Sequence, residues 1–458
     1  MTARRPGATL RKPVDAAALG VFRIAFGAIV LVEIVRFFAH GWIRRHYLEP
    51  AFLFTYPGFG WIVPWPGAGL YAHFAVTGLC AAMVALGLFY RVAIVGLFLG
   101  FAYAFLLDQA SYLNQYYLAL CVALILCLLP AERAFSLDAR RTRVAPVAPR
   151  WSVLALRAQF ELMLLHAGLV KLNEDWLRGQ PLALWLSERS DLPIVGPWLA
   201  LPGLAVVAAH GVVILHLIGA PLLLLRRTRL VVFVLYVGFH LASAVLFRIG
   251  MFSWLTLAGT LMFFDPDWPR AVWRRLGGEG DRAPVTAERN RRDRPAPATL
   301  ALLAAFLVLQ LLLPLRSLLY PGKVAWTRQG EWFSWRMKLD DSRASARFVV
   351  TAPGSGGRWE VDPRDYLSPR QTEMMAARPD LILQFAHFLA RTWAAREGVP
   401  DAEVRAVVLC ALNGRQPALL IDPARDLARV ARTSTPRDWI LPLTVPLDAA
   451  STNARRAR

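Results

Sequence analysis

The sequence predicts a polytopic α-helical membrane protein of about nine transmembrane helices, followed by a C-terminal extracytoplasmic domain that is β-rich or α+β. Three observations predict this fold class. Of the 458 residues, 56% are hydrophobic and 18% are charged, and the mean hydropathy is +0.41, which is too apolar for an ordinary soluble protein. The apolar residues are gathered into runs long enough to cross a bilayer. After Pro321 the runs give way to alternating apolar and polar residues, which is typical of strands.

The helical part consists of apolar runs whose lengths suit the roughly 30 Å hydrocarbon core of a membrane. The eighth run is short, and only Tyr90 and Arg91 separate the second from the third, so the count is about nine. The runs cover approximately 17–38, 70–89, 92–108, 115–130, 152–171, 204–225, 230–247, 250–264 and 299–319. The first carries Arg23, Glu33 and Arg36 and is followed by no small-residue cleavage site. We therefore interpret it as a membrane anchor and not as a removed signal peptide.

The Lys and Arg residues between the runs predict the orientation, because cytoplasmic loops are enriched in positive charge. The chain has 52 Lys plus Arg against 32 Asp plus Glu, a net charge of +20. Alternate loops, starting with the N-terminal arm, carry 21 of the basic residues, whereas the loops between them carry 6. This asymmetry predicts a multi-pass cell-membrane protein with a cytoplasmic N-terminus and a periplasmic or extracellular C-terminal domain. It also makes nucleic-acid binding an unnecessary explanation of the charge.

The predicted domains are residues 1–319 in the membrane and 320–458 outside it. Within the second, RFVVTA, RWEVD and AVVLCAL are strand-like, and a helix is expected at 370–396. The polar segment 276–298 is rich in Gly, Pro and Arg and is interpreted as a cytoplasmic loop. The four cysteines have no spacing typical of metal ligands, and Cys410 is alone in its domain, so neither a metal site nor a disulfide framework is predicted.

Polar and ionisable residues within or beside membrane spans are functional candidates, because burying them in hydrocarbon is costly. Lys171 ends the fifth run, and Asn114 and Gln115 lie at the expected outer turn before the fourth. The further candidates, which share only their position in or next to a span, are Asp108, Gln159, Glu161, His166, His210, His216, His240 and Arg248. For His210, His216 and Gln159 an interhelical hydrogen bond is an equal alternative. For Lys171 and Arg248 the alternative is a side chain that reaches the membrane interface.

Lys171 has a clear chemical use at the mouth of an apolar cavity. Loss of hydration destabilises the ammonium form, lowers the pKa and leaves a neutral amine that acts as a base near neutral pH. Such a base suits a lipid-soluble acid such as a phenol or a hydroquinone. The spacing alone does not separate a quinone enzyme from a proton-coupled transporter.

Several long segments resemble the vitamin K-dependent gamma-glutamyl carboxylase family, including its bacterial members with a horizontally transferred transmembrane (HTTM) domain. The block RAQFELMLLHAGLVKLNEDWLRG at 157–179 carries the most specific part, AGLVKLNEDW. The resemblance continues in SYLNQYYL, in FHLASAVLFRIGMFSWLTLAGTLMFFDPDWPR at 239–270, in GEWFSWRMKL at 330–339 and in NGRQPALLIDPARDLARV followed by WILPL. It covers roughly residues 13–445.

The resemblance implies a nine-span fold with an extracytoplasmic β-rich domain, and it implies a reaction. Lys171 corresponds to the family's base, which deprotonates vitamin K hydroquinone. Oxygen then converts the quinol to its epoxide, and the strong base so formed removes a γ-proton from a glutamate, which captures carbon dioxide. The implied cofactor is vitamin K hydroquinone or menaquinol, with oxygen and carbon dioxide as co-substrates. Asn114, Gln115 and His240 are the expected cofactor-binding residues.

The sequence also departs from the family pattern. The family has a histidine after the asparagine of the outer turn, whereas this chain has Gln115, which donates a hydrogen bond but does not shuttle a proton. A family tyrosine in the fifth span is replaced by Leu164, and the tyrosine-bearing stretch after the last span is here GEWFSW, with Trp332 and Phe333.

Three functions are compatible with these features. The first is a quinol-dependent carboxylase-like enzyme, with membrane lipids, a quinol and an exported protein substrate as partners. The second is a catalytically inactive scaffold or a lipid- or quinone-binding protein of the same fold. The third is a transporter that relays protons through Glu161, His166 and Lys171; it predicts discontinuous spans and internal pseudo-symmetry, neither of which is visible in the sequence, so it ranks last.

Overall fold

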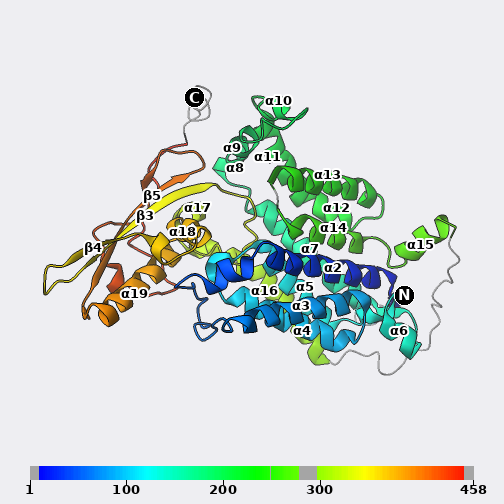
Figure 1. Ribbon diagram of the computed structural model, residues 1–458. Helices are drawn as coiled ribbons and strands as arrows, with labels where there is room; N and C mark the ends of the chain where they lie inside the picture. Colours follow the sequence, from blue (N-terminus) through cyan, green and yellow to red (C-terminus); the bar gives the residue numbers. More distant parts are fainter. Residues whose placement is uncertain (1–9, 248, 278–296, 448–458) are drawn as a thin grey trace.

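The computed structural model describes residues 10–247, 249–277 and 297–447. It has an elongated shape in which a helical bundle occupies one part and a sheet with two covering helices occupies the other (Figure 1). Most of the helices are apolar along their whole length, because the runs that form them contain few charged residues. The fold is therefore mostly helical, with a sheet-containing C-terminal domain.

One to three consecutive helices lie at each of the nine positions where an apolar run occurs. Their bounds are α2 (Ala17–Ala39), α3 (Ala68–Leu86), α4 (Tyr90–Leu106), α5 (Asn114–Leu128), α7 (Arg150–Leu169), α11 (Leu204–Ile214) with η4 (Leu215–Gly219) and α12 (Ala220–Leu223), α13 (Arg229–Phe247), α14 (Met251–Thr260) with η5 (Leu261–Phe263), and α16 (Pro297–Leu312) with η7 (Leu313–Leu319). Among the described residues, five of these segments are long and apolar enough to cross a membrane, namely 17–39, 68–86, 204–223, 229–247 and 297–319. The helices at 90–106, 114–128 and 251–263 are apolar but shorter.

Short elements connect the bundle helices. They are β1 (Pro13–Asp15), η1 (Arg44–Leu48), η2 (Gln109–Ser111), η3 (Ala131–Arg133), α6 (Leu137–Thr142), β2 (Val147–Pro149), α8 (Glu174–Leu177), α9 (Leu182–Ser187), α10 (Gly196–Leu199), α15 (Trp268–Arg275) and α17 (Val324–Thr327). The antiparallel pair β1 and β2 joins two loops that are far apart in the sequence.

Alternate loops gather at opposite ends of the bundle. At the end away from the sheet, β1 pairs with β2, and Arg270 of α15 contacts Asp15 at 3.0 Å. At the same end Arg91 contacts Glu132 at 3.0 Å. Figure 1 shows α6 and α15 at this end, beside the N-terminus and far from the sheet. These are the loops with the larger number of basic residues, so the arrangement of the helices agrees with the charge asymmetry in the sequence.

Arg23 illustrates how this end of the bundle holds a charge inside the protein. The side chain is fully buried, and its guanidinium donates hydrogen bonds to the carbonyl oxygens of Val84 at 2.6 Å, Ala85 at 2.9 Å and Phe135 at 2.6 Å. Carbonyls at a helix C-terminus have no partner within the helix, so Arg23 satisfies the end of α3. Its role is structural.

The C-terminal domain is a four-stranded antiparallel sheet in the order β4-β3-β5-β6. Its strands are β3 (Ser342–Thr351), β4 (Arg358–Val361), β5 (Glu403–Leu412) and β6 (Ala418–Leu419), and the short turns η8 (Pro363–Asp365) and η9 (Leu427–Arg429) flank its helices. The strands contain the three segments predicted to be extended. The single helix expected at 370–396 is two helices, α18 (Pro369–Ala376) and α19 (Pro379–Arg396), because a proline at 379 cannot continue the preceding helix. With two helices on the sheet, the domain is α+β.

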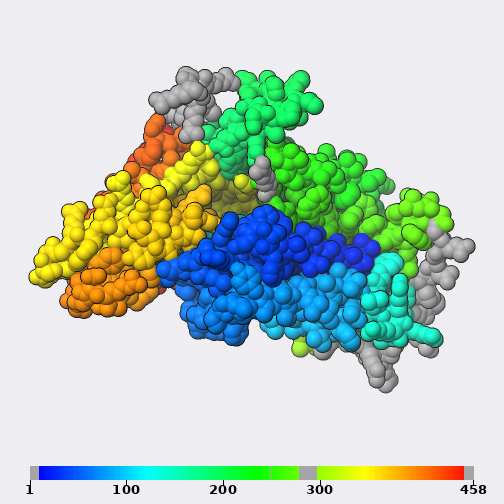
Figure 2. All heavy atoms as spheres, in the orientation of Figure 1, coloured from blue at the N-terminus to red at the C-terminus, as the bar shows by residue number. Residues whose placement is uncertain are grey.

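The two parts share a hydrophobic core. Phe54, from the loop after α2, and Ala110, from the turn before α5, are fully buried in the cluster that contains Phe348 of β3 and Phe385 of α19. Figure 2 shows the C-terminal residues, yellow to orange, packed directly against the N-terminal segment, which is blue. The loops at this end of the bundle are therefore held by the C-terminal domain.

Candidate functional site

A cavity of about 720 Å³ lies where the helical bundle meets the C-terminal domain. Its wall is formed by the ends of α2, α5, α7 and α13, by the start of α14 and by the segment 328–342. The four residues predicted as a site all lie on this wall, namely Lys171, Asn114, Gln115 and His240. They come from three different places in the sequence, so the tertiary structure brings them together.

Lys171 lies two residues beyond the end of α7, outside the membrane-spanning helices. The residue is 4% exposed, and its Nζ donates hydrogen bonds to the carbonyl oxygens of Ala167 at 2.9 Å and Met337 at 3.4 Å. The ammonium also lies 5.1 Å from the ring centroid of Trp176. Within the described ranges it forms no ion pair. Burial, with a smaller contribution from the positive charge of Arg336, lowers the pKa of Lys171 to about 7.

Asn114 connects the bundle to the segment after the last helix. Its Nδ2 donates to the carbonyl oxygen of Arg336 at 3.2 Å, and its Oδ1 accepts from the hydroxyl of Tyr112 at 3.1 Å. The hydroxyl of Tyr112 in turn accepts from the backbone N–H of Phe333 at 3.1 Å. Asn114 and Lys171 thus bind the carbonyls of two consecutive residues and hold this segment against the cavity.

Gln115 faces a turn that only a glycine accommodates easily. Gly250, at the start of α14, has a φ of +57°, which is strained for other residues. A Cβ at this position would lie 3.4 Å from Nη1 of Arg36 and 3.8 Å from Nε2 of Gln115. The half-buried amide of Gln115 is therefore close to Arg36, which pairs with Glu33 at 2.7 Å.

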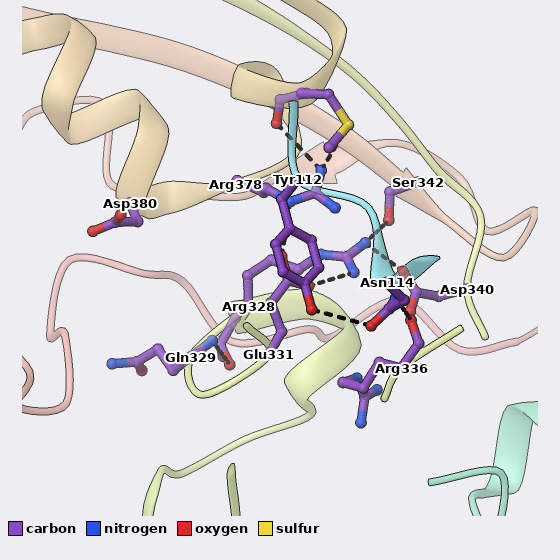
Figure 3. Close-up of polar contacts among 12 residues, drawn as sticks. Tyr112, Asn114, Arg328, Gln329, Glu331, Arg336, Asp340, Ser342, Arg378 and Asp380 are labelled. Atoms are coloured by element: carbon purple, nitrogen blue, oxygen red, sulfur yellow. Dashed lines mark hydrogen bonds and ion pairs between the residues drawn. The ribbon is translucent and has the colours of Figure 1, made fainter. Parts of the chain in front are cut away.

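A network of ion pairs anchors the segment 328–342 on the side of the C-terminal domain (Figure 3). Arg328 contacts Glu331 at 3.0 Å and Asp340 at 2.5 Å, and Arg378 contacts the second oxygen of Glu331 at 2.7 Å. The two carboxylates raise the pKa of Arg328 in spite of its burial, so it stays charged. Trp335, inside the same segment, has a φ of +53°. The contacts on both sides outweigh the cost of this backbone conformation.

His240 is 1% exposed, and neither of its ring nitrogens has a hydrogen-bond partner among the described residues. The ring lies between Tyr236, Phe239 and Phe252, with centroid distances of 5.0 to 6.1 Å. Buried polar atoms without partners are rare in proteins, and at a cavity wall they indicate a ligand that supplies the missing bond. The residues present therefore fit a ring that carries hydroxyl groups.

The other intramembrane candidates are separate from the cavity, with one exception. His216 lies on its wall and bonds the carbonyl of Val212 at 2.8 Å. His166 binds two carbonyl oxygens, of Leu162 and Leu311, and His210 is exposed. His166 and His210 do not line the cavity. Asp108, Gln159 and Glu161 do not line it either. Arg248 lies outside the described residues. Glu161, His166 and Lys171 therefore form no continuous relay.

Sequence reasoning missed the charged residues that the segment 328–342 and α18 bring to the cavity. Arg336 and Arg370 both line it, although neither lies in or near a predicted span. The stretch GEWFSWRMKL contains Arg336. Because this stretch resembles the family, the resemblance could have identified Arg336 as a candidate site residue. Its side-chain direction depends on positive φ angles that no sequence pattern indicates. Within the described part of the chain, no group of three or more His, Cys, Asp or Glu residues is arranged to hold a metal ion.

A second contact between the two parts of the chain is a buried ion pair. Arg415 donates two hydrogen bonds to Asp175 of α8, at 2.6 and 2.7 Å, and Asn413 donates a third at 2.8 Å. Asp175 belongs to the block AGLVKLNEDW, and the other two residues belong to NGRQP. Asp175 and Arg415 are both buried. This pair therefore joins two motifs that are far apart in the sequence.

Comparison with known families agrees with this architecture. The family model described as the HTTM domain matches residues 11–268, which is more than half of the chain. The family model described as the vitamin K-dependent gamma-carboxylase, lumenal domain, matches residues 295–445, which include the sheet and the segment beside Lys171. No solved structure matches the chain. The resemblance inferred from the motifs is confirmed, and the chain belongs to the HTTM-domain gamma-carboxylase family.

Proposed function

We propose that the chain is an integral membrane, quinol-dependent gamma-glutamyl carboxylase-like enzyme in which Lys171 is the base. One observation carries the proposal. In the part of the chain that the structure describes, a buried lysine without an ion pair lies on the wall of a cavity of about 720 Å³, together with two side-chain amides and a histidine whose ring nitrogens have no hydrogen-bond partner. The match to a carboxylase lumenal domain supports the same reaction class. The proposed cofactor is vitamin K hydroquinone or menaquinol, with oxygen and carbon dioxide as co-substrates.

Each of these residues on the cavity wall has a different proposed role. The bound quinol would supply a reduced ring whose reaction with oxygen provides the strong base needed to remove a glutamate γ-proton. Lys171 accepts a hydroxyl proton at Nζ, since its pKa of about 7 leaves a large neutral fraction at physiological pH. Gln115 and His240 offer hydrogen bonds to ring oxygens, and the aromatic side chains of Phe239 and Phe252 exclude water. Asn114 positions the segment beside Lys171.

We further propose nine spans, with residues 1–319 forming the membrane domain and residues 320–458 a periplasmic or extracellular domain. The nine helical positions and the gathering of basic loops at one end of the bundle support this orientation. The domain boundary follows the end of η7 at Leu319. A cysteine introduced at Arg227 in intact cells is expected to react with a membrane-impermeant maleimide only after permeabilisation, whereas one at Arg364 is expected to react without it. Labelling of both positions in intact cells would contradict the orientation.

The replacement of His240 tests whether its unpartnered nitrogens serve a ligand. We expect His240→Phe to leave the melting temperature in nanodiscs unchanged or higher, because it removes two buried polar atoms without partners. It is expected to weaken quinol binding by about tenfold, the effect of one lost hydrogen bond. Tryptophan fluorescence titration with reduced menaquinone measures the affinity.

His166→Phe is the matched control, since both nitrogens of His166 contact backbone carbonyls. It is expected to lower the melting temperature while leaving quinol affinity unchanged. A His240→Phe protein that binds quinol as the wild type does would show that His240 is not a ligand-binding residue.

The activity itself is tested with the full chain in lipid nanodiscs, supplied with reduced menaquinone or vitamin K, oxygen, labelled bicarbonate and a glutamate-containing peptide. We expect quinone epoxide and labelled peptide to form together. If a folded, quinol-saturated protein forms no epoxide while a family member assayed in parallel does, the function is that of a scaffold or a lipid- or quinone-binding protein. Exported proteins with accessible glutamates are the proposed substrates.

A further inference from the structure

We propose that Arg336 binds a side-chain carboxylate of the acceptor substrate in the cavity, and that it selects an acid over the corresponding amide. The inference rests on the proposed function for the identity of the ligand as an acceptor. It begins, however, from an observation that is independent of that function. The guanidinium of Arg336 lies at the cavity wall and forms no ion pair with a carboxylate of the described residues.

Three other arginines at the cavity wall form ion pairs with carboxylates of the protein. Arg36 pairs with Glu33, Arg328 pairs with Glu331 and Asp340, and Arg378 pairs with Glu331. The acids among these contacts are thus already engaged by other arginines.

Arg336 makes no such contact within the described residues. Its Nε is buried without a hydrogen-bond partner, and its guanidinium forms no ion pair. Burial lowers the pKa of Arg336, although not enough to neutralise an arginine. Figure 3 shows the guanidinium turned away from Arg328, Asp340 and Ser342. The charges of Asp340 and Glu331 partly offset the effect of burial on the pKa of Arg336, but both carboxylates form their ion pairs with other arginines. Arg336 is half-buried, and a charge that is partly withdrawn from water is stabilised by a partner, so the geometry leaves that place to an anion in the cavity.

The position of Arg336 fixes where this anion would lie. Its backbone carbonyl is held by Asn114 at 3.2 Å, and the carbonyl of the next residue, Met337, is held by Lys171 at 3.4 Å. Trp335 and Lys338, on either side of this pair, have positive φ angles of 53° and 43°. The backbone is therefore locked at the two residues that adjoin Lys171. An anion on the guanidinium would lie next to the proposed base.

A carboxylate is the anion that suits this site. Arginine presents two parallel N–H groups that match the two oxygens of a carboxylate, and such pairs are stronger than neutral hydrogen bonds. The amide of glutamine offers only one acceptor oxygen and no charge. Arg336 would thus distinguish glutamate from glutamine before any reaction occurs.

Arg370 provides a matched comparison, because it also lines the cavity and its Nε is also buried without a partner. The positive charge of Arg370 acts on His46 and Tyr47, whereas that of Arg336 acts on Lys171. The two guanidinium groups therefore have different surroundings. Only Arg336 is expected to govern binding of an acid beside the base.

The test measures binding without quinol or turnover. The full chain in phosphatidylcholine nanodiscs at pH 8, where Lys171 is mostly neutral, is titrated by calorimetry with N-acetylglutamate α-amide and with N-acetylglutamine α-amide. We expect the acid to bind at least tenfold more tightly than the amide. Arg336→Gln is expected to weaken acid binding about 10- to 100-fold, as for a lost hydrogen bond to a charged group, and to leave amide binding unchanged. Arg336→Lys is expected to restore part of the affinity.

Arg370→Gln, with the same change of charge on the same cavity, is expected to stay within threefold of the wild type. Equal losses in Arg370→Gln and Arg336→Gln would indicate a general electrostatic field and overturn the site. Wild-type affinity in Arg336→Gln would also overturn it. If anionic phosphatidylglycerol in the nanodisc abolishes acid binding, the anion of Arg336 is a lipid headgroup and the carboxylate assignment is wrong.

The outcome is separable from the proposed function. Arg336-dependent acid binding in a protein that forms no epoxide would retain this inference and reject the quinol chemistry. Epoxide formation without Arg336-dependent acid binding would support the quinol chemistry and reject the role of Arg336.

Discussion

Lys171→Met is expected to reduce quinol epoxide formation about 10²- to 10⁴-fold, the usual contribution of a general base. Methionine is close to lysine in length, so the change removes the amine together with its contacts to the carbonyls of Ala167 and Met337 and to the ring of Trp176. The folded state of the variant is checked by its melting temperature in nanodiscs. Epoxide formation at the wild-type rate in a folded Lys171→Met protein would show that the base is another group.

The pH dependence of the wild type tests the same assignment independently. The neutral amine is the active form, and burial lowers the pKa of Lys171 from its ordinary 10.5 to about 7. Activity should therefore rise with pH through about 7 and level off above it, whereas a solvent-exposed lysine would still be mostly protonated there. Besides burial, the positive charge of Arg336 contributes to this midpoint, because it lowers the pKa of Lys171 further. The residual activity of Lys171→Met should lack this transition.

Asp175→Asn is expected to destabilise the protein by about 3 to 5 kcal/mol, because it leaves the buried guanidinium of Arg415 without its counterion.

The wild type is expected to lose the stabilisation by the Asp175–Arg415 ion pair at acidic pH. Burial alone would raise the pKa of Asp175, but the hydrogen bonds from Arg415 and Asn413 and the charges of Arg415 and Lys323 outweigh it and lower the pKa below 3.8. The stabilisation is therefore complete above the ordinary pKa of an aspartate and is lost as the pH falls through the lowered value.

Thermal unfolding in nanodiscs as a function of pH measures both effects. Asp362→Asn is the control, since Asp362 pairs with an exposed Arg364 in the same C-terminal domain, and little change is expected there. A wild-type melting temperature in Asp175→Asn would show that the pair does not hold the two parts of the chain together. Restoration by the double variant Asp175→Asn with Arg415→Met would indicate that the unpaired charge causes the loss.

Much of the architecture is visible in the sequence because membrane helices and loop charges obey local rules. A run of about 20 apolar residues forms a helix wherever it occurs, so a helix was found at each expected position, even where length and hydropathy do not by themselves qualify it as a span. Strands in the C-terminal domain followed from alternation. The expected single helix at 370–396 did not take account of Pro379, which ends α18 and begins α19.

Lys171, Asn114, Gln115 and His240 were among the candidates in the sequence because a polar group near a membrane span is costly, and the family resemblance singled them out. Their common cavity was not identifiable. It depends on the C-terminal domain packing against the bundle, which brings the carbonyls of 336 and 337 to Asn114 and Lys171. Likewise, an arginine in a polar stretch looks ordinary in the sequence. Only the tertiary structure, by burying the Nε of Arg336 and pairing the nearby acids with other arginines, decides that Arg336 forms no ion pair with the described residues.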